Sequence, residues 1–245
     1  MIHIRILVPV TTNAIRQESD LAHLDQPGVR YSIAFIDTGP TSIESRFDEV
    51  FALPGMVALA LEAEADGVDA VVIDCMGDPG LAALREAVSL PVIGVAQTAM
   101  ATISSLAHSF GIVSVAASTG PIFRDLVAIY GMERHYVGAR AIDIPVVDLK
   151  SHNDDVKEAL AENAITLVRD HGAEAVILGC TGFFGCAAYI RERLGALDYR
   201  VPVIDPLPFA TLMAAALVRH GISHSRISYP ANPRIKPVKG YALPG

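Results

Sequence analysis

The sequence has no tryptophan, few aromatic residues and little charge. Aromatic residues make up 6% of the 245 positions and hydrophobic residues 51%, so the core must consist mainly of Ala, Val, Ile and Leu. That composition suits helices packed on parallel strands better than a β-sandwich. Charged residues make up 19% of the chain, below the usual quarter. We therefore expect part of the surface to be covered by self-association, in a homo-oligomer.

The chain also lacks a basic excess and a long apolar run. Its formal net charge is −8, whereas phosphate binding requires clustered Lys and Arg, so we expect no nucleic-acid partner. No apolar stretch approaches the roughly 20 residues of a membrane span. The opening MIHIRILVPV is too short for a secretory signal and no small-residue cleavage site follows it. We expect a cytoplasmic protein that has no membrane partner and acts on a small molecule.

Cysteine is scarce, with Cys75, Cys180 and Cys186 as its three occurrences. An odd, low count is not typical of a disulfide framework. Metal binding would need further His or Cys close by, and no CxxC motif is present. We therefore expect no metal site.

Short apolar runs alternate with Ala-, Leu- and Glu-rich stretches at helical spacing. The runs are continuously apolar, as is typical of strands covered on both faces. Repeated alternation predicts a parallel sheet with right-handed crossovers, and ligands bind beyond the carboxyl ends of such strands. The expected strands are 2–8, 31–37, 69–74, 91–94, 111–115, 174–179 and 201–204, and the expected helices include 56–66, 80–88, 96–108, 155–171 and 206–220.

Two parts of the chain have similar sequences and form an internal repeat. Residues 70–108 and 175–220 each contain an apolar strand, a Cys, a Gly two residues later, a helix with Arg-Glu, a PVI strand and an Ala-rich helix that ends at His. Two copies predict an α/β fold of two pseudo-symmetric lobes, each a mostly parallel sheet flanked by helices, with the active site in the cleft between them. The expected lobes are 1–96 plus 206–245, which includes a C-terminal return and an extended tail from His224, and 97–205.

The repeated residues Cys75 and Cys180 are candidates for an acid–base pair. Each follows a strand and precedes a helix, where free N–H groups and the helix dipole stabilise a thiolate or an oxyanion. We expect Asp78 and Thr181 to cap these helices. One thiolate could remove a proton from one face of a carbon next to a carbonyl while the opposite thiol protonates the other face.

Two other interpretations of these cysteines remain. The pair could be a structural repeat of buried, inert residues, since free Cys often behaves as a small hydrophobe. A Cys–His hydrolase would need an orienting His, and the eight His residues do not cluster around either Cys in the sequence.

Five motifs are the most specific pieces of the chain. They are GPTSIESRFDE at 39–49, CMGDPGLAALRE at 75–86, PVIGVAQTAM at 91–100, LGCTG at 178–182 and PVID at 202–205. The chain resembles the aspartate/glutamate/hydantoin racemase superfamily over nearly its whole length, and most closely the hydantoin and allantoin racemases. The resemblance implies catalysis by Cys75 and Cys180 without a cofactor, with inversion at C5 of a 5-substituted hydantoin or an allantoin-like ring.

The resemblance also implies substrate contacts. The loop after the first strand usually reads Asn-Pro-Asn-Thr in the family, and Val8 and Val10 replace both asparagines here. Gln97 stands where many relatives have Glu, and Gly182 stands where amino-acid racemases have His, which favours a ring amide over a free amino acid. Cys186 is expected inside the following helix as a core residue. The implied contacts are Pro9, Val10, Thr11, Ser42, Ile43, Gly77, Thr119, Thr181 and Gly182.

Three alternative functions stay open. They are an aspartate/glutamate-type amino-acid racemase, a maleate-type isomerase or decarboxylase of the same superfamily, and a non-catalytic protein that binds a small ligand. Decarboxylases of the superfamily carry only the Cys of the second half, so the presence of both argues against them. Maleate-type isomerases carry two, and a binding module would have no need for matched thiols.

Overall fold

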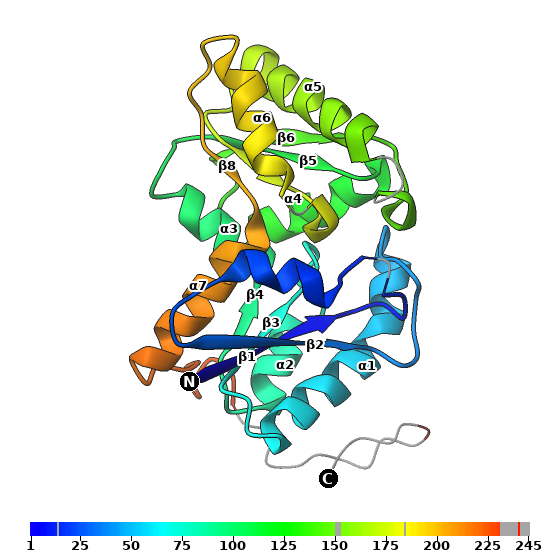
Figure 1. Cartoon of the computed structure of the whole chain (residues 1–245), viewed down its shortest axis with the longest axis vertical. Coiled ribbons are helices and arrows are strands. Elements are labelled where there is room, and N and C mark those ends of the chain that lie inside the picture. The colour runs from blue at the N-terminus through cyan, green and yellow to red at the C-terminus, as the bar shows by residue number, and fades with distance from the viewer. Residues whose placement is uncertain (14, 150–152, 184, 231–239, 241–245) are drawn as a thin grey trace. The chain divides into compact units, whose positions relative to one another are not determined.

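The computed structural model describes residues 1–13, 15–149, 153–183, 185–230 and 240 (Figure 1). The chain forms two compact units. The first comprises Met1–Ile43, Phe47–Val95 and Ala210–Gly245, and the second comprises Glu44–Arg46 and Ala96–Phe209. Each unit contains one parallel four-stranded sheet flanked by helices, as the alternation of apolar runs predicted.

The sheet of the first unit has the strand order β2-β1-β3-β4. All three strand pairs are parallel, and β3 is buried along its whole length because it lies inside the sheet with helices around it. Helix α2 packs against β4. The strands are β1 (Ile2–Val8), β2 (Val29–Phe35), β3 (Ala70–Ile73) and β4 (Val92–Gly94), and the helices are η1 (Glu18–Leu24), α1 (Arg46–Ala65), α2 (Leu81–Ala87) and most of α7 (Pro206–Arg219).

The sheet of the second unit repeats this topology in the order β6-β5-β7-β8, again with every pair parallel. Helices α5 and α6 lie side by side, and α5 packs on β5 and β6. The strands are β5 (Phe110–Ser114), β6 (Tyr136–Ala141), β7 (Val176–Leu178) and β8 (Val203–Ile204). The helices are α3 (Val95–Ile103), η2 (Ala117–Thr119), α4 (Gly120–Ile129), η3 (Val146–Asp148), α5 (Asn153–His171), η4 (Thr181–Phe183) and α6 (Cys186–Gly195).

The long helices of the two units end in the same way. After α1, Gly67 adopts φ 69°, and after α5, Gly172 adopts φ 70°. This left-handed conformation stops a helix at little cost when the residue is glycine. The two glycines are 105 residues apart, as are Cys75 and Cys180, so the repeat extends from the helix through its following strand to the cysteine.

Several helix starts differ from the sequence-based prediction. Helix α1 begins ten residues before the expected 56 and runs through Pro54. Helices α2 and α6 begin after Gly80 and Gly185, which are their N-caps in the left-handed conformation. Asp78 and Thr181 lie further upstream, in the turns that follow the cysteines, so the expectation that they cap these helices is wrong.

The part of the C-terminal segment that the structure describes lies on the first unit. The Nε2 atom of His224 accepts a hydrogen bond from the backbone N–H of Val92 at 2.7 Å. Arg226 donates to the carbonyls of Arg85 and Val88 at 3.1 and 2.7 Å. The expected tail from 224 to 245 is therefore anchored at its start, while 231–239 and 241–245 lie outside the described residues. Among the helices described, none has both the length and the apolar character to cross a membrane.

Candidate active site

The same backbone turn carries Cys75 in the first unit and Cys180 in the second. Each cysteine lies two residues after an inner strand, β3 or β7, and opens the pattern Cys-x-Gly-x-x-Gly. The last glycine of each copy is left-handed, with φ 73° at Gly80 and 82° at Gly185, and it immediately precedes α2 or α6. The sequence repeat is thus a repeat of local structure.

In both turns a backbone amide points at the sulfur. The N–H of Gly77 donates to Sγ of Cys75 at 3.5 Å, and the N–H of Gly182 donates to Sγ of Cys180 at 3.3 Å. Both thiols are partly exposed. A hydrogen bond donated to sulfur favours the thiolate, the form that acts as base and nucleophile. The same backbone donor therefore favours the thiolate form in both turns.

Each cysteine also lies at the position in its sheet where α/β proteins bind ligands. The strand order reverses between β1 and β3 in the first unit and between β5 and β7 in the second. Ligands of such sheets bind beyond the carboxyl ends of the strands at this reversal. The loops that flank it are residues 9–11, which follow β1 in the first unit, and residues 115–119, which follow β5 in the second.

The expected substrate contacts of the first unit fall on loops at that edge. Pro9 and Val10 are buried and Thr11 is exposed. The N–H of Thr11 donates to the carbonyl of Pro40 at 2.9 Å, which ties the loop after β1 to the loop that carries half-buried Ser42 and Ile43. Val10 is only 3% exposed, so the apolar side chain that replaces the family's asparagine is buried.

The expected contacts of the second unit divide into buried and accessible groups. The hydroxyl of Thr119 is held by Ser114 at 2.8 Å and by the carbonyl of Ala116 at 2.7 Å. Thr181 is buried directly after Cys180, and Gly182 is half-buried. Because its hydroxyl is hydrogen-bonded to Ser114 and to the carbonyl of Ala116, Thr119 mainly stabilises the loop after β5.

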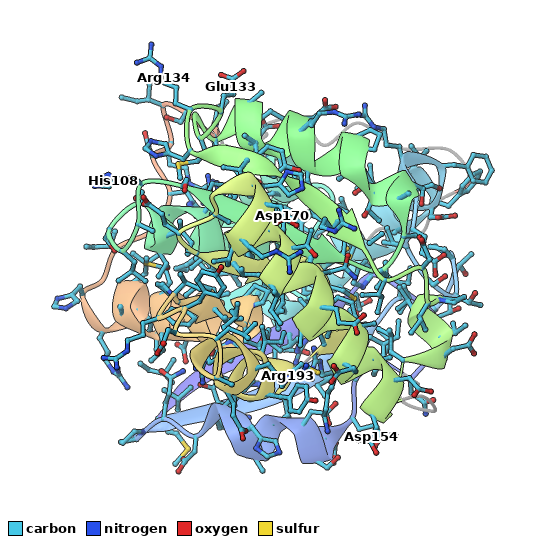
Figure 2. The ribbon with its side chains drawn as sticks, turned by 90° about the horizontal axis from the view of Figure 1, so that it is seen from above. His108, Glu133, Arg134, Asp154, Asp170 and Arg193 are labelled. Carbon is cyan, nitrogen blue, oxygen red and sulfur yellow. The ribbon has the colours of Figure 1, made fainter. Side chains whose placement is uncertain are left out.

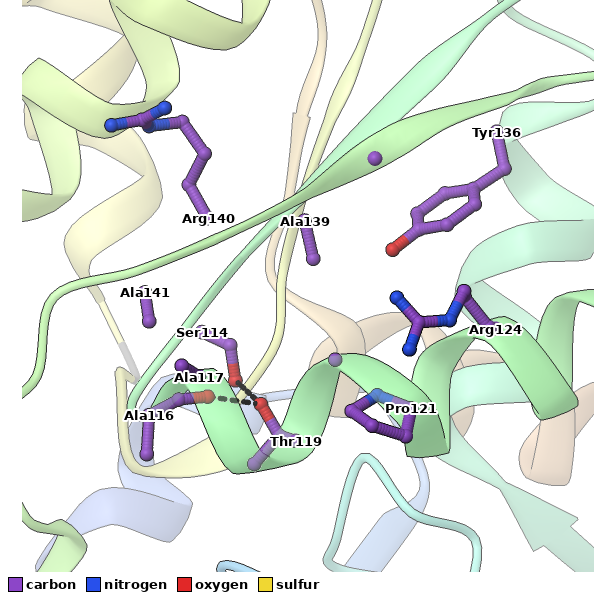
Figure 3. Close-up of a pocket in the computed structure, with 12 residues that line it drawn as sticks. Ser114, Ala116, Ala117, Thr119, Pro121, Arg124, Tyr136, Ala139, Arg140 and Ala141 are labelled. Atoms are coloured by element: carbon purple, nitrogen blue, oxygen red, sulfur yellow. Dashed lines mark hydrogen bonds between the residues drawn. The ribbon is translucent and has the colours of Figure 1, made fainter.

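A groove of about 470 Å³ lies beside Thr119, between α4 and the edge strand β6 (Figure 3). Tyr136 and Arg124 point toward each other inside it. Burial raises the pKa of Tyr136 to about 12, so its hydroxyl stays protonated near neutral pH. Neither Cys75 nor Cys180 is among the residues that line it, so this groove is separate from the cysteine turns.

A buried ion pair next to the first cysteine was not predicted from the sequence. Arg16 binds the carboxylate of Asp74 with two hydrogen bonds, at 2.8 and 3.1 Å, and both side chains are almost fully buried. Asp74 immediately precedes Cys75. Arg16 belongs to a polar segment 58 residues away from Asp74. The only sign of this ion pair in the sequence was therefore the position of Asp74 directly before Cys75.

A second missed residue is Glu49 of α1. A carboxylate oxygen of Glu49 lies against the Cα atom of Gly77, in the place that a side chain at this position would take. The Sγ atom of Cys75 lies 3.7 Å from the same place. Glu49 closes the motif GPTSIESRFDE, but a single sequence does not reveal which of its acidic residues faces the cysteine.

The third cysteine differs from the other two. Cys186 is 5% exposed at the start of α6. Burial raises the pKa of its thiol to about 11, so the thiol stays protonated at neutral pH. It is a core residue, as expected from the sequence. Among the residues that the structure describes, no three His, Cys, Asp or Glu side chains gather as a metal-binding group.

Comparisons with known proteins identify the fold and the family. The Asp/Glu/Hydantoin racemase family model matches residues 11–214. The chain is 39% identical to a hydantoin racemase of Rhizobium meliloti over 83% of each chain. It superposes on the allantoin racemase of Klebsiella pneumoniae with a TM-score of 0.91 at 32% identity, over 98% of this chain and 97% of that one. An allantoin racemase of Pseudomonas fluorescens gives 0.86 at 28% identity, over 98% and 100%. With this agreement of sequence, fold and matched cysteine turns, the chain belongs to the Asp/Glu/hydantoin racemase family and is an isomerase of the racemase type.

Proposed function

We propose that this protein inverts the C5 stereocentre of a 5-substituted hydantoin or an allantoin-like ring, with Cys75 and Cys180 as the acid–base pair and without a cofactor. The observation that carries the proposal is the matched pair of turns, in which a glycine N–H donates to each sulfur. The relatives named hydantoin racemase and allantoin racemase support the choice of a cyclic amide as substrate.

The reaction needs one proton removed and one delivered. The thiolate of one cysteine takes the proton from C5, and the electron pair spreads onto the adjacent ring carbonyl. The thiol of the other cysteine then gives its proton to the opposite face of C5, and the electron pair returns to carbon. Each turnover leaves the two sulfurs with exchanged protonation states, so the next turnover runs in the reverse sense or follows proton exchange with water.

The test uses single-enantiomer substrates in deuterated water. We expect the parent protein to incorporate deuterium at C5 and to invert allantoin or 5-benzylhydantoin, followed by NMR for exchange and by polarimetry for inversion. Aspartate and glutamate, offered in parallel, should show neither. Turnover of an amino acid instead would replace the proposed substrate class.

The cysteine variants separate the two roles. Cys75→Ser and Cys180→Ser should each lose inversion by a factor of about 10²–10⁴, the usual contribution of an acid or base. Each should retain slow deuterium exchange with one enantiomer, because the remaining thiolate still reaches one face. Cys186→Ser is the matched control and should invert at the parent rate. Parent rates in both active-site variants would overturn the two-cysteine mechanism.

Two further expectations remain part of this proposal. The low cysteine count favours the cytoplasm, where thiols stay reduced. Self-association is supported by an exposed aromatic pair on α1, in which Phe47 is 72% and Phe51 56% exposed and the ring centroids lie 4.9 Å apart. Light scattering after size-exclusion chromatography would give the mass directly.

A further inference from the structure

Glu49 brings a carboxylate to the turn of Cys75. Its Oε1 atom is buried and touches the position over the Cα atom of Gly77, beside Sγ of Cys75. Only a glycine leaves room for this arrangement, because any Cβ atom at residue 77 would collide with the carboxylate. The same glycine donates its N–H to the sulfur. One short turn thus combines a donor, which favours the thiolate, with a carboxylate, which opposes it.

In the second unit the carboxylate at the corresponding helix position is exposed to solvent. The repeat relates Cys75 to Cys180 and Gly67 to Gly172 by the same offset of 105 residues, which relates Glu49 to Asp154. Asp154 also lies in the first turn of its helix, but its side chain is fully exposed. Figure 2 shows it projecting outward from the end of α5. Its cationic neighbour is Lys157, 3.9 Å away.

We propose that Glu49 is a positioning residue that biases Cys75 toward the protonated thiol, so that the two cysteines of the repeat are chemically unequal. This inference rests on the proposed two-cysteine function. Its basis is the side-by-side placement of the Glu49 carboxylate and the Cys75 sulfur around Gly77, together with the solvent exposure of Asp154 at the equivalent position.

The other charged groups near the first turn do not supply the same effect. Asp74 precedes Cys75, but its carboxylate is bound by the guanidinium of Arg16. Asp78 follows, with its carboxylate directed over the Cα atom of Gly94 at the end of β4.

The second turn has a carboxylate of its own, but at another place. Oδ2 of Asp205 accepts the N–H of Gly185 at 3.0 Å, five residues beyond Cys180. This bond lies at the far end of the turn, whereas Glu49 lies at the glycine whose N–H binds the sulfur. Comparing variants of one cysteine, rather than the two cysteines with each other, therefore isolates the effect of Glu49.

The different tendencies of Cys75 and Cys180 to hold a proton would determine which enantiomer reacts with the resting protein. A negative carboxylate close to sulfur disfavours a second negative charge there. Between turnovers Cys75 would then carry a proton more often than Cys180. The enantiomer whose C5–H faces Cys180 would then react with the resting form, and the other would need a prior change of protonation. The kcat/KM values of the two enantiomers should accordingly depend differently on pH.

The test measures each thiol separately. The rate of alkylation by iodoacetamide would be followed between pH 5.5 and 10 by peptide mass spectrometry, for the parent protein, Glu49→Gln and the matched control Asp154→Asn. In Glu49→Gln the midpoint of the Cys75 profile should fall by about one pH unit, while that of Cys180 stays in place. In Asp154→Asn neither midpoint should move.

A second variant keeps the test decisive if the Gln substitution disturbs folding, which circular dichroism would reveal. Glu49→Asp retains the charge but draws it back by one methylene, and its Cys75 midpoint should lie between those of the parent and Glu49→Gln. An unmoved Cys75 midpoint, or equal shifts at both cysteines, overturns the inference. A Cys75 shift in a protein that inverts no ring would leave the inference standing and overturn the proposed function. Normal inversion with an unmoved Cys75 midpoint would overturn the inference and leave the proposed function standing.

Discussion

Arg16 and Asp74 form a two-pronged ion pair inside the first unit, with Nε of Arg16 2.8 Å from Oδ2 and Nη2 3.1 Å from Oδ1. The side chains are 1% and 0% exposed. Removing either partner would take both of these charge-assisted hydrogen bonds away from the buried charge that remains, which costs far more than the pair itself contributes. Because Asp74 is bonded to Cys75 in the chain, this ion pair also fixes the start of the cysteine turn.

Arg16→Met should therefore lower the free energy of unfolding by about 3–5 kcal/mol, measured by urea denaturation. Adding Asp74→Leu should restore much of the loss, because both charges are then gone. The control is Arg5→Met, whose partner Asp66 is 60% exposed, and its cost should stay below about 1 kcal/mol. Equal losses for Arg5→Met and Arg16→Met would contradict this account of the buried pair.

The packing of Asp78 over Gly94 predicts a steric effect. A Cβ atom at residue 94 would lie 2.5 Å from Oδ2 of Asp78, so Gly94→Ala should destabilise the protein by about 1–3 kcal/mol. Gly195→Ala is the control, because Gly195 is helical with open space at its Cβ position, and it should be neutral or mildly stabilising.

A double variant identifies the clash as the cause. Asp78 itself has φ 46°, a conformation that glycine adopts without strain. Combining Asp78→Gly with Gly94→Ala should therefore recover more stability than two independent changes would give. Thermal unfolding of the four proteins gives the coupling, and strict additivity would show that these residues do not interact as described.

His224 predicts a pH dependence of stability. Burial, followed by the charge of Arg85, lowers its pKa to about 4. Unfolding returns the group to its ordinary pKa near 6.5, so the unfolded chain binds the extra proton between these values. The contribution of neutral His224 to the free energy of unfolding is complete above about pH 6.5 and is lost as the pH falls toward 4.

Between pH 7 and pH 5 that loss should be about 1 kcal/mol, after allowance for the partial exposure of the ring. It would be measured as the difference in unfolding free energy between pH 7 and pH 5. His224→Gln should weaken this dependence, whereas His220→Gln, an exposed neighbour on the same segment, should keep it. The same pH slope in all three proteins would rule out His224 as its source.

Cys186 should behave as an inert thiol. With its pKa raised to about 11 by burial, it should resist iodoacetamide at pH 8 in the folded protein and react after unfolding in urea. Cys186→Ala should preserve racemase activity and cost about 1 kcal/mol of stability for the lost packing. Rapid alkylation of native Cys186 would place it on an accessible surface.

The sequence predicted the elements that are apolar along their whole length. Strands β3 and β7 fall within the expected ranges because every residue in them is apolar and buried, so hydrophobicity alone marks them. Strand β6, with the sequence YVGARA, was not predicted. It lies at the edge of its sheet, where Gly138 and Arg140 interrupt the apolar pattern.

The cysteine turns were predictable for a different reason. Their pattern is local and occurs twice, so the two copies reinforce each other in the sequence. Arg16 and Glu49 reach the first turn from 58 and 28 residues away, counted to Asp74 and Gly77. No periodicity or motif encodes such contacts, because they depend on how helices and loops pack on the finished sheet.

The return of the chain to the first unit affects the order in which the protein can be completed during synthesis. The segment around His224 supplies hydrogen-bond partners to Val92, Arg85 and Val88, which leave the ribosome some 130 residues earlier. Until the segment around His224 has been synthesised, the backbone groups at the start of β4 and at the end of α2 must form hydrogen bonds with water. The whole second unit is translated before the first can close, so a nascent chain arrested near residue 205 should carry an unfinished first unit.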